Sequence, residues 1–409
     1  MKWHTDRVRT GVQIQGEIGM KKFRKVIIFS VILILAAACI LGGVLISNSM
    51  TGGKKDKMAD NTADTEKKTD TERKIDTEKK TDTEKKTVPD LNTAKKAMDV
   101  FLTNFYVKEG DGGYIVGEDF WQQAEIFEIV IDAYEQTKDK KYLDLMNEMY
   151  RGFVKEHGAD WSSNEFNDDI MWMTIACARA YEATGQSEYL EQARKLFKIV
   201  FDRAWSEDLG GGLFWKTENK TKNSCINCPA VIAACLLHKI TGEDEYIEKA
   251  LMIYKWERAN LFGTTGAVFD AYDLKTGVNQ WASTYNQGTF IGAAMMLYQY
   301  SKDESYLKDA VLAADYTVNT MFSGQIMNTE GDGRDLPGFK GILVRWMGRL
   351  VRECGQDQYK DWLEKNAQAA WNNRNTKGIM WTLWNQKTED TFYSAWGCSA
   401  GVSMLFNWE

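Results

Sequence analysis

Proline and histidine are scarce in this 409-residue chain. Only three prolines (Pro89, Pro229 and Pro337) and three histidines occur. Proline interrupts helices because it lacks an N–H group and clashes with the preceding turn. From residue 91 onward, long helix-forming segments are therefore broken mainly by glycine-containing loops. We expect this part of the chain to be almost entirely helical.

The sequence also lacks the residue sets of several enzyme classes. Cys225-x-x-Cys228 has no second cysteine pair and no histidine pair beside it, so we expect no zinc site. Phosphate-binding loops and nucleophile elbows do not occur. The acidic motifs of terpene synthases and terpenoid cyclases fail at Trp172 and Phe166. We expect no metal and no cofactor, and the cysteines remain open to two interpretations, disulfides or buried thiols.

Charge is absent from one long stretch near the N-terminus. Residues 26–50 carry no charged side chain, whereas residues 1–25 have a net charge of +5. An uncharged, mostly apolar run over residues 26–47 after a basic cytoplasmic segment is typical of a transmembrane signal anchor or a signal peptide. Three fates are open: an uncleaved anchor, lipidation at Cys39, or cleavage after Ala38 or near residue 47. The protein is then expected at the cell surface or secreted.

Residues 48–90 contain a six-residue repeat, Asp-Thr-Glu-Lys-Lys-Thr, with variations. Within residues 51–90, eleven basic side chains balance eleven acidic ones, and apolar residues are few. This composition predicts a disordered, solvated linker. The run Met20-Lys-Lys-Phe-Arg-Lys is typical of the natural N-terminus of a protein with a signal sequence. Residues 1–19 are therefore a candidate gene-model extension.

Residues 91–409 form one acidic domain. The whole chain has a net charge of −7, residues 1–25 have +5 and the linker has zero, so this domain has a net charge of −12. Nucleic acid is therefore not expected as a partner. We expect a monomer.

A repeat runs through the helix connections of this domain. Similar turns place Tyr142, Tyr189, Tyr246 and Tyr306 about fifty residues apart. In each unit the first helix is apolar nearly all round and the second is amphipathic, which indicates one enclosed and one outer helix. The enclosed helices lie near 120–136, 168–183, 227–240, 285–300, 340–353 and 396–408.

Five amphipathic helices accompany the six enclosed ones, and residues 92–107 supply a sixth. The pattern predicts an all-α fold, an (α/α)6 barrel of two concentric rings, with a superhelical solenoid as the competing arrangement. Pairing of residues 92–107 with the last enclosed helix would close the ring.

In such a barrel the N-terminal ends of the inner helices meet at one mouth. The loops that lead into these helices carry aromatic, amide and carboxylate side chains, a set that suits a carbohydrate better than an apolar ligand. For any single tryptophan, filling of the core is the simpler interpretation. The loops are 117–121, 161–169, 210–215 with 222–229, 281–288, 337–341 and 393–396.

Two adjacent carboxylates, Asp168 and Asp169, stand at the start of one enclosed helix. Glycosidases need one carboxylic acid that protonates the leaving oxygen and a second carboxylate that is the nucleophile or activates water. Close placement at a helix N-terminus splits the pKa values of such a pair. Helix capping, with Asn164 or Asn167 as the N-cap, is the alternative that spacing alone favours.

Four blocks in order resemble glycoside hydrolase family 76 over residues 95–409. They are Phe166–Trp172, Gly210–Trp215 with Lys222, Asn223 and Asn227, Tyr285–Gly292, and Phe339–Ile342. The resemblance implies an (α/α)6 barrel and endo-acting α-1,6-mannanase activity with retention of configuration. By the same resemblance Asp168 is the nucleophile and Asp169 the acid/base.

The resemblance also implies a set of substrate-binding side chains. They are Asn167, Trp215, Asn223, Asn227, Asp270, Tyr285, Asn286, Gln287, Phe339 and Lys340. Cys225 and Cys228 depart from the small or amide residues expected near Asn227. The implied partner is an α-mannan polysaccharide or oligosaccharide. Two alternatives stay open, a cell-surface mannan transglycosylase and a non-catalytic mannan-binding surface protein.

Overall fold

The computed structural model describes residues 88–328, 330–331, 333, 335–391 and 393–409, which lie in one compact unit, Thr81–Glu409. The basic segment, the apolar run 26–47 and nearly all of the linker 48–90 lie outside the described residues. The structure therefore concerns the predicted helical domain.

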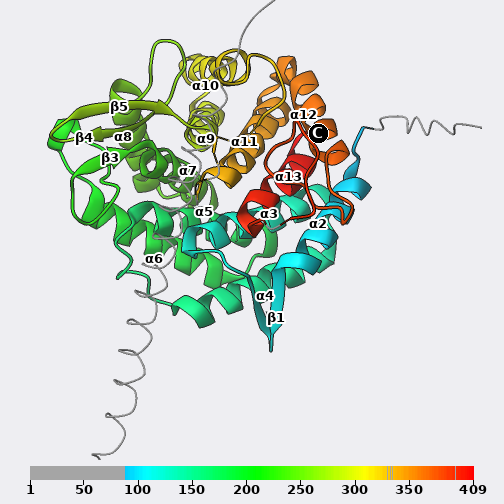
Figure 1. The fold of residues 1–409 in the computed structure, drawn as a ribbon. Helices are drawn as coiled ribbons and strands as arrows, with labels where there is room; N and C mark the ends of the chain where they lie inside the picture. The colour runs from blue at the N-terminus through cyan, green and yellow to red at the C-terminus, as the bar shows by residue number, and fades with distance from the viewer. Residues whose placement is uncertain (1–87, 329, 332, 334, 392) are drawn as a thin grey trace, which may run out of the picture. The chain divides into compact units, whose positions relative to one another are not determined.

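Helices in this domain alternate between an inner and an outer ring (Figure 1). The inner helices are α3 (Phe120–Thr137), α5 (Asn167–Thr184), α7 (Ser224–Thr241), α9 (Thr284–Ser301), α11 (Phe339–Cys354) and α13 (Ala395–Asn407). The outer helices are α2 (Leu91–Phe105), α4 (Lys140–His157), α6 (Ser187–Ala204), α8 (Asp244–Asn260), α10 (Glu304–Tyr316) and α12 (Lys360–Asn372).

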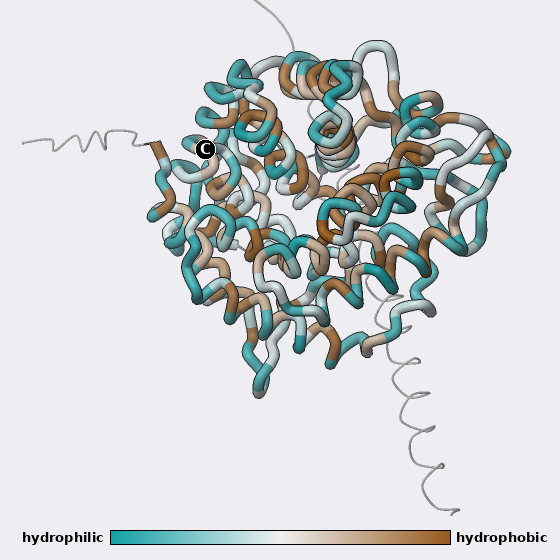
Figure 2. Tube along the Cα trace, turned by 180° about the vertical axis from the view of Figure 1, so that it is seen from behind, coloured by the Kyte–Doolittle hydropathy of each residue, from teal (hydrophilic) through white to brown (hydrophobic). Residues whose placement is uncertain are grey.

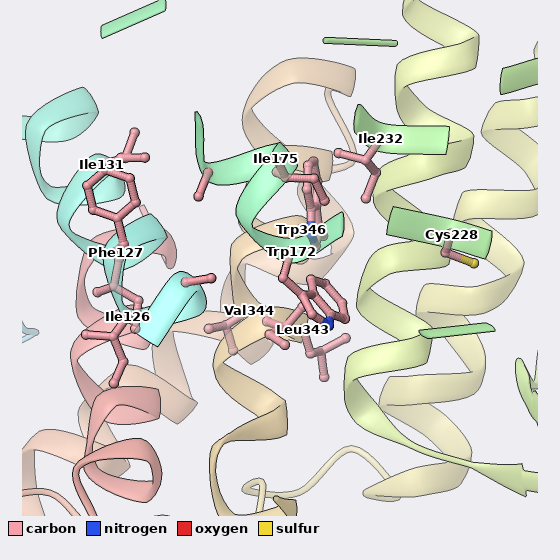
Figure 3. Packing of buried hydrophobic residues seen from close by; sticks show 14 of the residues in the cluster. Ile126, Phe127, Ile131, Trp172, Ile175, Cys228, Ile232, Leu343, Val344 and Trp346 are labelled. Carbon is pink, nitrogen blue, oxygen red and sulfur yellow. The ribbon is translucent and has the colours of Figure 1, made fainter. Parts of the chain in front are cut away.

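The two rings differ in burial as their sequences predict. Inner helix α5 is buried along nearly its whole length, whereas outer helix α6 buries a single stripe that includes Tyr189, Leu196 and Val200. Large side chains of the inner ring, such as Trp172 and Trp346, fill the space between facing helices (Figure 3). Along the tube, hydrophilic and hydrophobic residues alternate (Figure 2), as expected when each outer helix presents one face to the core and one to water.

The ring is closed. Helix α13 packs against both α2 and α3, so the last inner helix meets the first hairpin. At this junction the Asn407 Nδ2 group donates to Asp132 Oδ2 over 3.0 Å. A solenoid would leave these helices apart. The (α/α)6 barrel is confirmed.

The repeated tyrosines lie at the contacts between neighbouring hairpins. Tyr142, Tyr189 and Tyr246 are buried, and Tyr306 is partly buried against the same core. The Tyr189 hydroxyl donates to Asn147 Oδ1 of the preceding outer helix over 3.0 Å. The repeat in the sequence therefore marks the seam between hairpins.

Short strands, which the helical pattern of the sequence does not predict, accompany the helices. Strands β1 (Tyr106–Glu109) and β2 (Gly112–Ile115) form a hairpin. Strands β3 (Thr221–Asn223), β4 (Phe269–Asp273) and β5 (Gly277–Ala282) form an antiparallel sheet. Because β3 leads directly into α7, this sheet joins two of the loops that were expected at the mouth.

Helix α7 is long and apolar enough to cross a membrane and is the one such helix among the described residues. Most of it is buried inside the ring, and it packs against α5, α8 and α9. Burial inside the barrel therefore accounts for the apolar composition of α7.

Candidate active site

A cleft of about 840 Å³ opens where the inner helices begin. Most of the residues that line it belong to the first turns or lead-in loops of α3, α5, α7, α9 and α11. They are Asp119, Phe120, Trp121, His157, Asn164, Phe166, Asp168, Asp169, Trp172, Trp215, Asn223, Cys225, Asp270, Trp281, Tyr285, Gly333, Asp335, Leu336 and Phe339. The lining is aromatic and acidic.

Asp168 and Asp169 lie in the first turn of α5, on the cleft surface. The N-cap of α5 is Phe166, whose side chain makes no capping hydrogen bond, so neither Asn164 nor Asn167 caps this helix. Asn164 instead accepts from the Phe166 N–H over 2.9 Å and donates to Asp169 Oδ2 over 3.0 Å. Capping does not account for the pair, because the carboxyls face the cleft.

The surroundings of the pair disfavour two negative charges. Burial, followed by the charge of Asp169, raises the pKa of Asp168 well above its usual range. Burial also raises the pKa of Asp169 to about 6; Asp335 adds to this shift, whereas the Asn164 hydrogen bond and Lys216 oppose it. The two carboxyls therefore titrate as a coupled pair that holds one proton near neutral pH.

Two hydrogen-bond donors face Asp168. The Trp215 indole N–H and the Cys225 thiol both lower the pKa of this carboxyl, while burial raises it. Asp168 Oδ1 and Trp215 Nε1 are buried and make no hydrogen bond of normal geometry. These polar atoms are available to a ligand at the bottom of the cleft.

Arg203 of α6 holds the loop before the Asp pair. Its guanidinium donates to Asn167 Oδ1, to the Ser162 carbonyl and to the Asn164 carbonyl, over 2.6, 2.7 and 2.8 Å. Asn167 in turn donates its side-chain amide to the Phe214 carbonyl over 2.8 Å and its backbone N–H to the Trp215 carbonyl over 2.9 Å. This network fixes Trp215 beside the carboxyls.

Aromatic rings form the floor of the cleft. Tyr285 and Phe339 stack with their ring centroids 3.9 Å apart. Trp121 contacts Trp172 and Phe339, with centroids 6.4 and 6.1 Å apart, and the Trp172 ring also neighbours Tyr285. Trp281 on β5 stands at the rim, 43% exposed. The floor offers apolar faces on which sugar rings can lie.

Asp270 faces the cleft from the β3–β5 sheet. The register of β4 and β5 shifts between Phe269 and Ala271, which places Asp270 at a bulge. Bulges redirect side chains and are common beside active sites. Asn279 Nδ2 donates to Asp270 Oδ2 over 3.0 Å, and burial raises the pKa of Asp270. Asp270 thus lies in the same cleft as the Asp pair, Asp119 and Asp335.

The expected site residues divide into two groups. Those that line the cleft are Asp168, Asp169, Trp215, Asn223, Asp270, Tyr285 and Phe339. The other five, Asn167, Asn227, Asn286, Gln287 and Lys340, are buried behind its wall.

Four of these five bond to backbone groups behind the wall, most of them in loops. Besides the Asn167 contacts, Asn227 accepts from the Leu213 N–H over 2.8 Å. The Gln287 side chain accepts from the Val268 N–H and donates to the Gly266 and Ala313 carbonyls. Lys340 Nζ donates to the Asn328 carbonyl over 2.9 Å. These side chains shape the wall and do not face the cleft.

Several lining residues were not among the expected ones. Trp121, Phe166 and Trp281 belong to the mouth loops that the sequence indicated, so their positions could have been used. His157, in contrast, ends outer helix α4, where nothing in the periodicity points to a cleft. It enters the lining because its ring packs between Phe120 and Phe153.

All six described cysteines are free thiols, and five of them are buried. Among the residues that the structure describes, no group of three or more His, Cys, Asp or Glu side chains is arranged to hold a metal ion.

Comparisons with known proteins agree with this geometry. The model of glycosyl hydrolase family 76 matches residues 90–405. An α-1,6-mannanase from Salegentibacter sp. HEL1_6 superposes with a TM-score of 0.72 at 30% identity, covering 78% of this chain and 98% of that one. An inactive variant of that enzyme, with two adjacent aspartates replaced by asparagine, was solved with α-1,6-mannotriose.

A sequence relative comes from a fungus. A putative mannan endo-1,6-α-mannosidase of Schizosaccharomyces pombe is 25% identical over 280 residues, which are 60% of this chain and 62% of that protein. The chain thus spans less than two thirds of the length of this relative. Because the family model covers nearly the whole described domain, the chain belongs to glycosyl hydrolase family 76.

Proposed function

We propose that this protein is an endo-acting, retaining α-1,6-mannanase that hydrolyses the backbone of α-1,6-mannan by double displacement. The observation that carries the proposal is the adjacent pair Asp168 and Asp169 in an aromatic cleft, both with raised pKa values. The Salegentibacter mannanase, whose inactive variant lacks two adjacent aspartates and binds α-1,6-mannotriose, supports it.

Asp168 is the nucleophile in this mechanism and Asp169 the acid/base. The Asp168 carboxylate attacks the anomeric carbon while Asp169 gives its proton to the glycosidic oxygen, and the bond to the leaving sugar breaks. A mannosyl ester on Asp168 results. Asp169, now ionised, takes a proton from water, and the hydroxide attacks the anomeric carbon and frees Asp168.

The location of the shared proton decides whether these roles are possible. Without a ligand, burial and the neighbouring charge favour the proton on Asp168. The reaction needs it on Asp169. A sugar hydroxyl that donates to Asp168, together with Trp215 and Cys225, stabilises the ionised form of Asp168. Binding of substrate then leaves the proton on Asp169.

Five further lining residues would contact the mannan. Tyr285, Phe339 and Trp215 present aromatic surface to the C–H faces of the sugar, and Asn223 and Asp270 present polar groups to its hydroxyls. Asn223 Oδ1 is buried without a hydrogen-bond partner, which suits a hydroxyl donor. A neutral polymer fits this acidic cleft better than a polyanion does.

Product sizing after incubation with linear and branched α-mannans tests the proposal. Residues 81–409, the compact unit, should release short oligosaccharides from the linear polymer. Release of mannose alone would contradict endo action. Longer products on addition of a sugar acceptor would instead identify a transglycosylase, and binding without cleavage would identify a mannan-binding protein.

We also propose that the domain acts at the cell surface or as a secreted enzyme. The basic segment, the apolar run 26–47 and the charged linker 48–90 together suit an anchor and a tether. Fractionation followed by N-terminal sequencing of the native protein separates retention of the anchor from cleavage or lipidation at Cys39. Recovery in the cytoplasm would contradict this location.

A further inference from the structure

A buried carboxyl of outer helix α8 lies directly behind the cleft wall. Glu257 is completely buried. Its Oε1 lies 2.5 Å from the hydroxyl of Ser224, the first residue of inner helix α7. The same hydroxyl oxygen lies 2.6 Å from the carbonyl oxygen of Phe269 on β4. One serine thus joins three elements.

The number of hydrogens decides the protonation state of this group. A serine hydroxyl has one hydrogen and can donate once, and a carbonyl oxygen can only accept. If Ser224 donated to an ionised Glu257, its oxygen and the Phe269 oxygen would meet at 2.6 Å with no hydrogen between them. If Glu257 is protonated, it donates to Ser224, and Ser224 donates to Phe269. Only the neutral acid satisfies both contacts.

The surroundings of Glu257 agree with a neutral acid. Burial raises the pKa of Glu257 to about 7, although the hydrogen bonds that Ser224 and Cys228 can donate to its ionised form act to lower it. On the same helix, Arg258 pairs with Asp309 of α10, over 2.5 and 3.0 Å, and does not neutralise Glu257. Tyr254 also donates to Asp309, over 3.0 Å. Within the described residues, no cation contributes to the pKa of Glu257.

Ser224 and Phe269, the other two members of this hydrogen-bond chain, adjoin residues of the cleft. Ser224 lies between Asn223 and Cys225, which line the cleft, and Phe269 precedes Asp270. The chain of two hydrogen bonds therefore ties the α7 wall to the β4 wall. We infer that neutral Glu257 is a positioning residue that holds Asp270 and Cys225 in place around the sugar bound beside Asp168. This inference rests on the proposed function.

Ionisation of Glu257 breaks the arrangement. The carboxylate can only accept, so Ser224 turns to donate to it, and the Phe269 carbonyl loses its donor. The bulge that carries Asp270 is then held less firmly. Cleavage should decline when Glu257 ionises, although Glu257 itself touches no substrate.

Glu257→Gln provides the decisive comparison. The amide has nearly the same shape and donates to Ser224 at every pH. At pH 5.5 we expect kcat/KM on linear α-1,6-mannan within about twofold of wild type, since the hydrogen-bond chain is intact. At pH 8.5 the variant should retain more of its activity than wild type does, because the amide that replaces the carboxyl cannot ionise. Superimposable pH profiles would overturn the inference.

Two other variants complete this comparison, one without the hydrogen-bond donor and one as a control for lost stability. Glu257→Leu removes the donor and should lower kcat/KM roughly tenfold or more at both pH values, since small displacements of site residues slow reactions strongly. Ile253→Ala, at a buried position on the same helix, should lower the melting temperature and leave the shape of the pH profile unchanged. If Ile253→Ala changed the pH profile of cleavage as much as Glu257→Gln does, the change would be a general effect of destabilisation and would contradict the inference.

Thermal unfolding tests Glu257 without any reference to mannan. The folded-state pKa of about 7 lies above the ordinary value of 4.5, so the stabilising contribution of the neutral acid is complete below pH 4.5 and is lost as pH rises toward 7. The melting temperature of wild type relative to Glu257→Gln should fall across this window. A constant difference would overturn the assignment of a neutral Glu257, whereas failure to cleave mannan would contradict only the proposed function.

Discussion

The inner helices carry buried carboxyls in two places, and their partners differ. Deeper in the ring, Arg179 donates to Glu128 and Asp132 of α3 over 2.7 and 2.6 Å, and Arg345 donates to Asp132 over 2.8 Å. At the mouth, Asp168 and Asp169 make no ion pair with arginine among the described contacts. The arginines hold the pKa of Asp132 well below its usual range, whereas the mouth pair is shifted upward.

The difference separates a structural use of buried carboxyls from a chemical one. A paired carboxylate stays ionised and joins helices, but it has no proton to give. A carboxyl without a cation keeps a proton close to neutral pH and can transfer it. Glu125 is intermediate: Arg345 donates to it over 2.7 Å, yet burial and Glu128 raise its pKa to about 8. The deep cluster, formed by Glu125, Glu128, Asp132, Arg179 and Arg345, therefore contains one carboxyl whose pKa is raised and not lowered.

The largest expected effect comes from changing the mouth pair. Asp168→Asn and Asp169→Asn should each reduce cleavage of linear α-1,6-mannan by roughly 10³-fold or more, because a nucleophile or an acid/base is lost. The melting temperature should stay constant or rise, since each substitution replaces a buried carboxyl that no arginine compensates with a neutral amide of nearly the same shape. Reducing-end assays and thermal unfolding measure the two effects. Near-normal turnover by either variant would refute the assignment.

Replacing Arg179 in the deep cluster should lower the stability of the protein, whereas replacing either aspartate of the mouth pair should not. Arg179→Met removes the guanidinium that donates hydrogen bonds to both Glu128 and Asp132, so Arg345 alone is left to compensate two buried carboxylates, and this should cost about 3–5 kcal/mol of unfolding free energy. Urea denaturation measures this cost. The exposed pair of Arg194 and Glu243, 2.8 Å apart, provides the control, and Arg194→Met should cost no more than about 1 kcal/mol. Equal costs would contradict the comparison.

The pH dependence of cleavage should show the shared proton. The active pair has one proton, so kcat/KM should rise with pH through about 6 as the first carboxyl ionises, then fall when the second ionises. Lys216 lowers the pKa of Asp169, so Lys216→Met should move the acidic limb to higher pH. A limb that stays in place or moves to lower pH would contradict this electrostatic coupling.

The smallest expected effect concerns the donors at Asp168. Trp215→Phe keeps an aromatic ring and removes the N–H that faces the nucleophile, so kcat should fall about tenfold. Trp256 donates its N–H to the Leu209 carbonyl over 3.1 Å, away from the cleft. Trp256→Phe should leave kcat nearly unchanged. A similar loss of kcat in both variants would show that the Trp215 N–H has no specific role at Asp168.

Most of the fold could be predicted from the sequence because helices repeat. Alternation of all-round apolar helices with amphipathic ones, and tyrosines such as Tyr189 at regular spacing, indicate two rings directly. The β3–β5 sheet could not be predicted, since its strands have three to six residues and lie within loops. The bulge that places Asp270 depends on pairing between distant segments.

The site was predictable to a similar extent. The start of an enclosed helix locates Asp168 and Asp169 at the mouth whatever the details of the loops. Asn227, Gln287 and Lys340 occur in the same loops as the residues that face the cleft, and in sequence the two kinds look alike. Their side chains bond to backbone groups of irregular loops, which tertiary structure alone determines.

Closure of the ring has a consequence for folding kinetics. Asp132 and Asn407, joined across the closing junction, are 275 positions apart, whereas neighbouring hairpins contact each other within a short stretch of chain. Distant contacts carry the larger loop-closure entropy and form slowly. We expect α2 and α13 to gain hydrogen-exchange protection together and late in refolding, and early protection of α13 would contradict this order. Asp132 acquires both Arg345 and Asn407 only at that step, so these hydrogen bonds stabilise the finished ring and do not speed its assembly.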